Sequence, residues 1–224
     1  MQLEVCTQSV EGALTAYRAG AHRIELCQAL PLDGLTPSWG MLEQIRQRCP
    51  DLKVNVLIRP REGDFVYTPD ELQVMRRDIE AAHESGANGV VFGCLTSNGD
   101  VDPGANALLL EAAAGMETTF HRAFDQVRHP QQELEAIIRL GFTRILTSGQ
   151  QPSALQGIPL IQELITQARG RISIMPGAGV SAANAARILR ETGATEIHGS
   201  LRTPQSGLWK PDEGVIKTIL QDIH

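Results

Sequence analysis

The 224-residue chain has 26 acidic and 20 basic residues, a formal net charge of −6, and 42% hydrophobic residues. This length and composition favour one packed core, a single domain over residues 1–224. The acidic balance, with no basic stripe, excludes nucleic acid as the main partner. The first residues lack a signal-peptide pattern and no run approaches the ~18 apolar residues of a membrane span, so we expect a cytoplasmic protein with no membrane partner.

Strand-like runs recur along the whole chain, about one every 28 residues (224/8). The expected strands are Leu3–Cys6, Arg23–Cys27, Val54–Arg59, Gly89–Gly93, Thr118–His121, Arg144–Ser148, Ile172–Met175 and Glu196–His198. Four of them follow similar junctions at Gly20, Gly86, Gly141 and Gly193. Glycine at these places can end a helix in the left-handed conformation before the next strand begins.

Helical segments with recognisable starts separate the strands. Thr68-Pro69-Asp70-Glu71 combines a capping box with a proline at the first helical position, and this helix is expected to end near Ser85. Asp102, Pro130 and Asp212 mark the starts of three further helices. Eight strands alternating with eight helices predict a single (β/α)8 TIM barrel, with a doubly wound open sheet as the alternative. The stretch Arg202–Pro211 shows no helix signal and is expected to be a loop.

Alternation within the strands predicts a polar barrel interior, because the aliphatic residues must face the helices. The residues expected inside are Glu4, Cys6, Glu25, Cys27, Asn55, Arg59, Thr119, His121, Ser173, Glu196 and His198. Active sites of such barrels lie at the carboxyl ends of the strands, where several of these side chains converge. The structural alternative is a network of Glu–Arg and Glu–His pairs that only fills the barrel.

A catalytic group is expected around the segment His121–Asp125 at the end of the fifth strand. His121 is a candidate general acid or base, with Asp125 or a nearby glutamate fixing its tautomer. Arg59 and Glu25 are expected on the same rim. A buried core histidine with satisfied hydrogen bonds is the alternative interpretation.

Two loops are candidates for binding an anion. Arg59 and Arg61 flank Pro60 and could clamp a carboxylate or phosphate, although a solvated loop has the same composition. Gly177 and Gly179 follow the seventh strand, where barrels often hold phosphate on backbone N–H groups, and Ser148 adds a small donor beside them.

The four cysteines have no CxxC spacing, which favours reduced thiols. Cys6 and Cys27 end the first two strands, which are expected to be neighbours ~4.8 Å apart. Two thiolates at that separation could hold a soft ion such as Cu(I). Buried cysteines that serve only as small hydrophobic residues are the alternative.

Several segments, taken together and in order, resemble the CutC copper-homeostasis family. They are Leu3–Cys6, Arg23–Cys27, Gly34–Ser38, Ile58–Arg61, Gly63–Phe65, Thr119–Asp125 and Leu146–Gly149. The resemblance implies a cytosolic TIM-barrel protein, a homo-oligomer such as a dimer or tetramer, with a role in copper tolerance or trafficking. It also implies that Cys6 and Cys27 match cysteines proposed as copper ligands, and that Arg59, Arg61, His121 and Asp125 match signature residues at the strand ends.

The sequence departs from the family after the eighth strand. Family members usually carry a longer segment there, whereas Ser206–Lys210 runs almost directly into Pro211. Two functions therefore stay open at this point: Cu(I) binding in copper homeostasis, or a barrel enzyme (lyase, isomerase or hydrolase) acting on a small anionic metabolite such as a phosphorylated sugar or a sugar acid.

Overall fold

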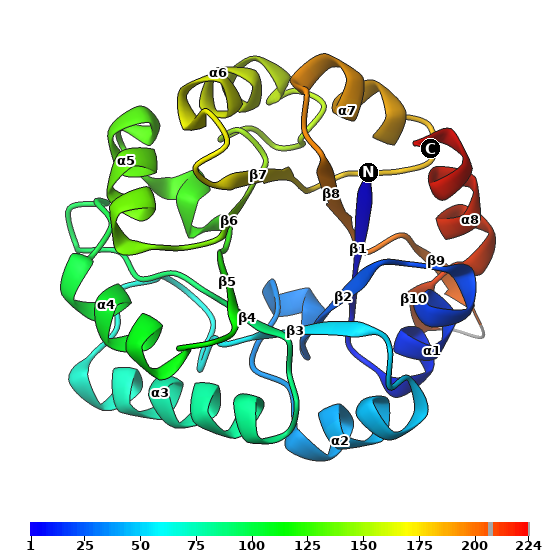
Figure 1. The fold of residues 1–224 in the computed structure, drawn as a ribbon, viewed down its shortest axis with the longest axis horizontal. Helices are drawn as coiled ribbons and strands as arrows, with labels where there is room; N and C mark the ends of the chain where they lie inside the picture. Colours follow the sequence, from blue (N-terminus) through cyan, green and yellow to red (C-terminus); the bar gives the residue numbers. More distant parts are fainter. Residues whose placement is uncertain (206–207, 224) are drawn as a thin grey trace.

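Eight parallel strands form a ring surrounded by helices in the computed structural model, which describes residues 1–205 and 208–223 (Figure 1). The barrel strands are β1 (Gln2–Thr7), β2 (Arg23–Leu26), β3 (Lys53–Leu57), β4 (Gly89–Phe92), β5 (Glu117–Phe120), β6 (Arg144–Thr147), β7 (Ser173–Pro176) and β8 (Glu196–Gly199). The helices are α1 (Val10–Ala19), α2 (Trp39–Arg48), α3 (Pro69–Glu84), α4 (Pro103–Ala112), α5 (Pro130–Leu140), α6 (Ile158–Ala168), α7 (Ala185–Thr192) and α8 (Glu213–Asp222). The predicted (β/α)8 barrel is confirmed, and the open sheet is wrong.

The strands follow one another around the ring in chain order. β1 pairs with both β2 and β8, and β7 lies beside β8, where the ring closes (Figure 1). The register sets Cys6 opposite Glu25 and Glu4 opposite His198. The first, second and eighth strands therefore present their polar residues at neighbouring positions. In the described part of the chain, each helix is too short or too polar to cross a membrane.

Glycine ends the helices as the junctions predicted. Gly20, Gly86, Gly141 and Gly193 have φ values of 89°, 81°, 94° and 76°. This left-handed region is readily open only to glycine, so each residue lets the chain leave its helix and enter the next strand.

The predicted capping box at the start of α3 is present. The Thr68 hydroxyl accepts from the backbone N–H of Glu71, and the Glu71 carboxylate accepts from the N–H of Thr68. We expect Thr68→Ala to lower the free energy of unfolding by about 1 kcal/mol, measured by urea denaturation. Thr218→Ala, a mid-helix change in α8, is the control and should change stability by less than about 0.5 kcal/mol. Equal effects of the two changes would contradict the capping role.

The expected loop at Arg202–Pro211 is instead an antiparallel hairpin, which corrects the sequence interpretation. β9 (Arg202–Gln205) pairs with β10 (Leu208–Pro211), while Ser206 and Gly207 lie outside the described residues. Asp212 anchors the hairpin by donating its backbone N–H to Leu201 O and accepting from the Thr203 hydroxyl, both at 2.8–2.9 Å. The strands escaped prediction because Pro204 and Pro211 interrupt any apolar alternation.

Paired charges fill the barrel interior near the amino-terminal ends of the strands. Arg23 bridges Glu4 and Glu196, and Arg144 makes a two-point contact with Glu196 at 2.7 and 3.2 Å. The structural alternative, a network that fills the barrel, is thus correct for this layer. The two arginines that neutralise these glutamates were not assigned to the interior from the sequence. Arg23 could have been, because it lies two residues before Glu25 in the same strand and therefore faces the same side.

Candidate functional site

A cavity of about 590 Å³ opens at the carboxyl ends of the strands. Of the residues singled out from the sequence, it is lined by Cys6, Glu25, Cys27, Arg59, His121, Asp125, Ser148 and Gly179. Arg61 and Gly177 are not among its lining residues. The barrel mouth is therefore where these side chains meet, as the fold class predicted.

The Cys6 and Cys27 thiols lie side by side at the β1–β2 edge of this cavity. Their Sγ atoms are 3.7 Å apart, and both side chains are buried. The Cys6 thiol also donates to Glu25 Oε1 at 3.4 Å, and the Cys27 thiol donates to the Thr7 carbonyl at 3.5 Å. Neighbouring parallel strands, with inward parity at both positions, bring the two sulfur atoms together.

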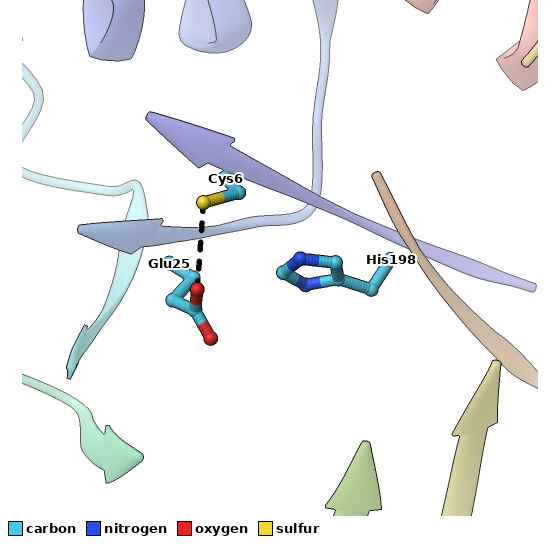
Figure 2. Close-up of side chains that lie close together, drawn as sticks. All are labelled: Cys6, Glu25 and His198. Atoms are coloured by element: carbon cyan, nitrogen blue, oxygen red, sulfur yellow. Dashed lines mark hydrogen bonds between the residues drawn. The ribbon is translucent and has the colours of Figure 1, made fainter. Parts of the chain in front are cut away.

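His198 from β8, expected inside the barrel but not predicted as a metal ligand, also lines the cavity and completes a group of possible ligands. One ligand atom each from Cys6, Glu25 and His198 lies within 4.8 Å of the others, and the three side chains converge from β1, β2 and β8 (Figure 2). His198 Nδ1 is 2.8 Å from Glu4 Oε1, which leaves Nε2 to face a ligand. The signal was available, because barrel closure places the eighth strand beside the first.

Burial and charge shift the protonation of this group. The hydrogen bond to Cys27, burial and the Glu25 charge raise the pKa of the Cys6 thiol well above its usual range. Burial also raises the pKa of Glu25. For His198, burial lowers the pKa, but Glu25, Cys6 and Glu4 together raise it well above 6.5. Burial opposes ionisation of Glu4 too, yet Arg23 and His198 lower its pKa to about 2. Glu4 and His198 therefore form a charged pair, and the nearby Cys6 thiol stays protonated.

His121 is held as a neutral imidazole. Its Nδ1 accepts from the Ala123 N–H at 3.3 Å, so the proton sits on Nε2, a buried atom with no partner among the described residues. The ring packs on Phe65, with centroids 4.7 Å apart. Burial, helped by the charge of Arg59, lowers the pKa of His121 to about 3. The expectation that a carboxylate fixes the tautomer is wrong, since a backbone N–H does so.

Asp125 organises the loop after β6, and its hydrogen bonds and ion pair are to residues other than His121. Its carboxylate accepts from the Thr147 hydroxyl and from the backbone N–H groups of Ser148 and Gln150, at 3.0–3.3 Å for the two N–H groups. Arg122 Nε is 2.7 Å from Oδ2. Both carboxylate oxygens are thus occupied, which suits a loop anchor better than a proton carrier.

The two arginines predicted to clamp an anion are engaged in loop contacts. Arg59 donates to the carbonyls of Leu32, Gly34 and Gly63 at 2.8–3.1 Å. Arg61 pairs with Glu71 and with Asp64, outside the cavity. Both guanidinium groups therefore hold the segment after β3, and neither offers a free fork to a ligand.

The predicted glycine loop after β7 lies only partly at the cavity. The Gly177 N–H donates to the Thr147 carbonyl at 2.9 Å, so this group is already bonded and the anion-binding role predicted for Gly177 is wrong. Gly179, with φ of 67°, lines the cavity. Ser148 also lines it, but its hydroxyl is bonded to Asp125 and to the Gln151 carbonyl.

The fold and this mouth define a TIM-barrel protein with buried thiols beside a carboxylate and an imidazole. Over residues 1–203 the chain matches the CutC family. It is 51% identical to the family protein CutC of Bacteroides thetaiotaomicron over 201 residues, covering 90% of this chain and 81% of that one. It is 49% identical to the human copper homeostasis protein cutC homolog over 207 residues, covering 92% and 76%.

A crystal structure of the putative copper homeostasis protein CutC from Streptococcus agalactiae superposes with a TM-score of 0.86 at 36% identity, covering 89% of this chain and 98% of that one. The chain belongs to the CutC family, which confirms the resemblance drawn from the sequence motifs. An aldolase with a TM-score of 0.72 at 15% identity shares only the barrel fold.

Proposed function

We propose that this protein binds Cu(I) in the cytoplasm as cargo of copper homeostasis, using Cys6 and Cys27 as its thiolate ligands. The observation that carries the proposal is the 3.7 Å separation of the two Sγ atoms at the edge of an open cavity. Thiolates are the ligands that Cu(I) prefers. The names of the relatives, which refer to copper homeostasis, agree with this choice of metal.

The sulfur separation favours a bent coordination. With metal–sulfur bonds of about 2.3 Å, as in zinc sites, a linear arrangement would need sulfur atoms ~4.6 Å apart, whereas 3.7 Å corresponds to an angle of ~107°. A third ligand is therefore expected. The candidates within reach of Cys6 are His198 and Glu25.

His198 suits the role of third ligand better than Glu25. Imidazole is a softer donor than carboxylate, and a metal-bound histidine usually holds a carboxylate with its other ring nitrogen. The contact between His198 Nδ1 and Glu4 supplies that arrangement. Glu25 then lies beside the metal, and its hydrogen bond to the Cys6 thiol places it to pass the thiol proton on to the solvent.

The test is a competitive Cu(I) titration of the reduced protein against a chelator. We expect one Cu(I) per chain in the wild type and loss of this binding in the double variant Cys6→Ser/Cys27→Ser. The matched control is Cys49→Ser/Cys94→Ser, which removes the two other buried thiols, both outside the cavity. Unchanged binding in the first double variant, or equal loss in the control, would refute the site.

The alternative enzyme has weaker support from the geometry. A histidine with a pKa of about 3 is a poor base at neutral pH, and both oxygens of Asp125 are occupied. The predicted homo-oligomeric state stays a prediction.

A further inference from the structure

One arginine at the cavity has no hydrogen-bond or ion-pair partner among residues 1–205 and 208–223. Arg202, the first residue of β9, lines the mouth, and no described residue accepts a hydrogen bond from its guanidinium or forms an ion pair with it. Its Nε is buried. Arg122 pairs with Asp125, and Arg59 donates to three carbonyls through its terminal nitrogens although its Nε is also buried without a partner among the described residues, so of the lining arginines Arg202 alone has no hydrogen bond to a described residue. A half-buried guanidinium without a counter-ion is unfavourable unless a ligand supplies the negative charge.

A loop with free backbone donors lines the same cavity. The carbonyls of Ala178 and Gly179 accept from the Ala154 N–H and from the Asn184 side chain, at 3.0 and 2.9 Å. The N–H groups of residues 178–180 have no acceptor among the described residues, so they are available to a ligand. Successive backbone N–H groups in such a turn form an anion-binding concavity.

Backbone strain marks the same loop. Ala178 has a φ of 80°, a conformation that is unfavourable for a residue with a Cβ. Gly179, with a φ of 67°, is in the left-handed region as well, so two consecutive residues of this loop depart from the usual backbone conformation. This observation adds to the unpaired arginine and does not replace it.

The loops after β7 and β8 are in contact, which unites these donors. A Cβ built on Gly199 would lie 3.4 Å from the Cβ of Val180. Ser200 follows Gly199 on the cavity wall, and its hydroxyl has no partner in the described part of the chain. Arg202 comes two residues later. The positions after strands 7 and 8 are those at which barrels of this class commonly hold phosphate.

We propose that the mouth carries a second site, for the oxyanion of a small metabolite, formed by Arg202, the Ser200 hydroxyl and the N–H groups of residues 178–180. The ligand is a phosphate monoester or a carboxylate, since both present the acceptor oxygens that these donors require. A single metal ion at the thiols occupies a small fraction of a cavity of about 590 Å³, a volume typical of metabolite sites. The site goes beyond the proposed copper binding, because it uses hard oxygen chemistry and none of the thiols.

The test is thermal denaturation and isothermal titration of the full chain at constant ionic strength, with inorganic phosphate, ribose 5-phosphate and succinate as probes. We expect at least one of them to raise the melting temperature and to bind with a Kd below about 10 mM. Arg202→Gln should weaken that binding at least about tenfold, and Arg202→Lys, which keeps the charge, should weaken it less. Arg190→Gln, at an exposed arginine of α7, is the control and should bind as the wild type does.

The probes distinguish the two ligand classes. Binding of phosphate and ribose 5-phosphate identifies a phosphate site, and binding of succinate alone identifies a carboxylate site; both support the proposal. Binding that persists in Cys6→Ser/Cys27→Ser separates this site from the copper site, so that either can fail without the other. No binding by any probe, or equal binding by the wild type and a folded Arg202 variant, would overturn it. Should Arg202→Gln not fold, the comparison of Arg202→Lys with the wild type decides.

Discussion

Replacing Arg23 with methionine is expected to lower the free energy of unfolding by about 3–5 kcal/mol at pH 7. Only 2% of the Arg23 side chain is exposed, and its guanidinium contacts Glu4 and, at 2.6 Å, Glu196. Methionine fills a similar volume but leaves each carboxylate with one cation fewer. Urea denaturation followed by circular dichroism measures the change.

The pH dependence identifies the cause of this loss. In the wild type, Arg23 and His198 lower the pKa of Glu4 to about 2 against the effect of burial. The ionised Glu4 carboxylate therefore adds to the free energy of unfolding above pH 4.5, and this stabilisation is lost as the pH falls toward 2. In the variant the carboxylates gain protons more easily. The difference between the two proteins should therefore shrink as the pH is lowered from 4.5 toward 2.

The control for this experiment is an exposed ion pair. Arg187 pairs with Glu191 at 2.8 Å, with 58% and 39% of their side chains exposed. Arg187→Met should change stability by less than about 1 kcal/mol, because solvent screens such pairs. A loss of similar size in both variants, or a difference for Arg23→Met that does not depend on pH, would contradict the role given to the buried network.

The barrel could be predicted because its signals are local and repeated. A glycine that ends a helix, as Gly141 does, and a capping box such as that of Thr68 act over a few residues, and the aliphatic parity of each strand is set by neighbours in sequence. The hairpin of Arg202–Gln205 with Leu208–Pro211 could not be predicted in this way. It depends on pairing with a segment that lacks alternation and on an anchor at Asp212.

The site was predicted as a region more accurately than as a set of roles. Parity placed Cys6, Glu25 and His121 at the mouth, as observed. It gave no information on what each polar group contacts. From the sequence, Arg59 and Asp125 were predicted to take part in catalysis. In the structure, their hydrogen bonds to backbone groups distant in sequence make them loop anchors. Such contacts join residues about 20–30 positions apart and leave no local pattern.

The arrangement of charges answers a physical objection to copper binding. Cu(I) prefers soft ligands, so the glutamates and arginines inside the barrel would have no part in binding it directly. In the structure Glu4, Glu196, Arg23 and Arg144 neutralise one another, and the contact of Glu4 with His198 links this layer to the thiols. The charged network thus holds His198, a candidate metal ligand, in place. These charges therefore have a structural role in the proposed copper site.

The affinity for Cu(I) is expected to rise at least about tenfold per pH unit, or about 100-fold between pH 6 and pH 8. The thiolate is the ligand, and the pKa of Cys6 lies well above its usual range because of its hydrogen bond to Cys27, its burial and the Glu25 charge. Throughout this range the metal must therefore displace a proton from Cys6. Raising the pH lowers the free energy needed to remove that proton, which sets the sign of the dependence.

Competition titrations at pH 6, 7 and 8, against a chelator calibrated at each pH, measure this slope. His198 also has a raised pKa, so its binding to the metal would release a further proton and steepen the dependence. His198→Gln should then reduce the slope by about one proton if His198 is the third ligand, and leave it unchanged if Glu25 takes that place. An affinity that stays constant from pH 6 to pH 8 in the wild type would show that the Cys6 thiol is not a ligand, whatever the stoichiometry of binding.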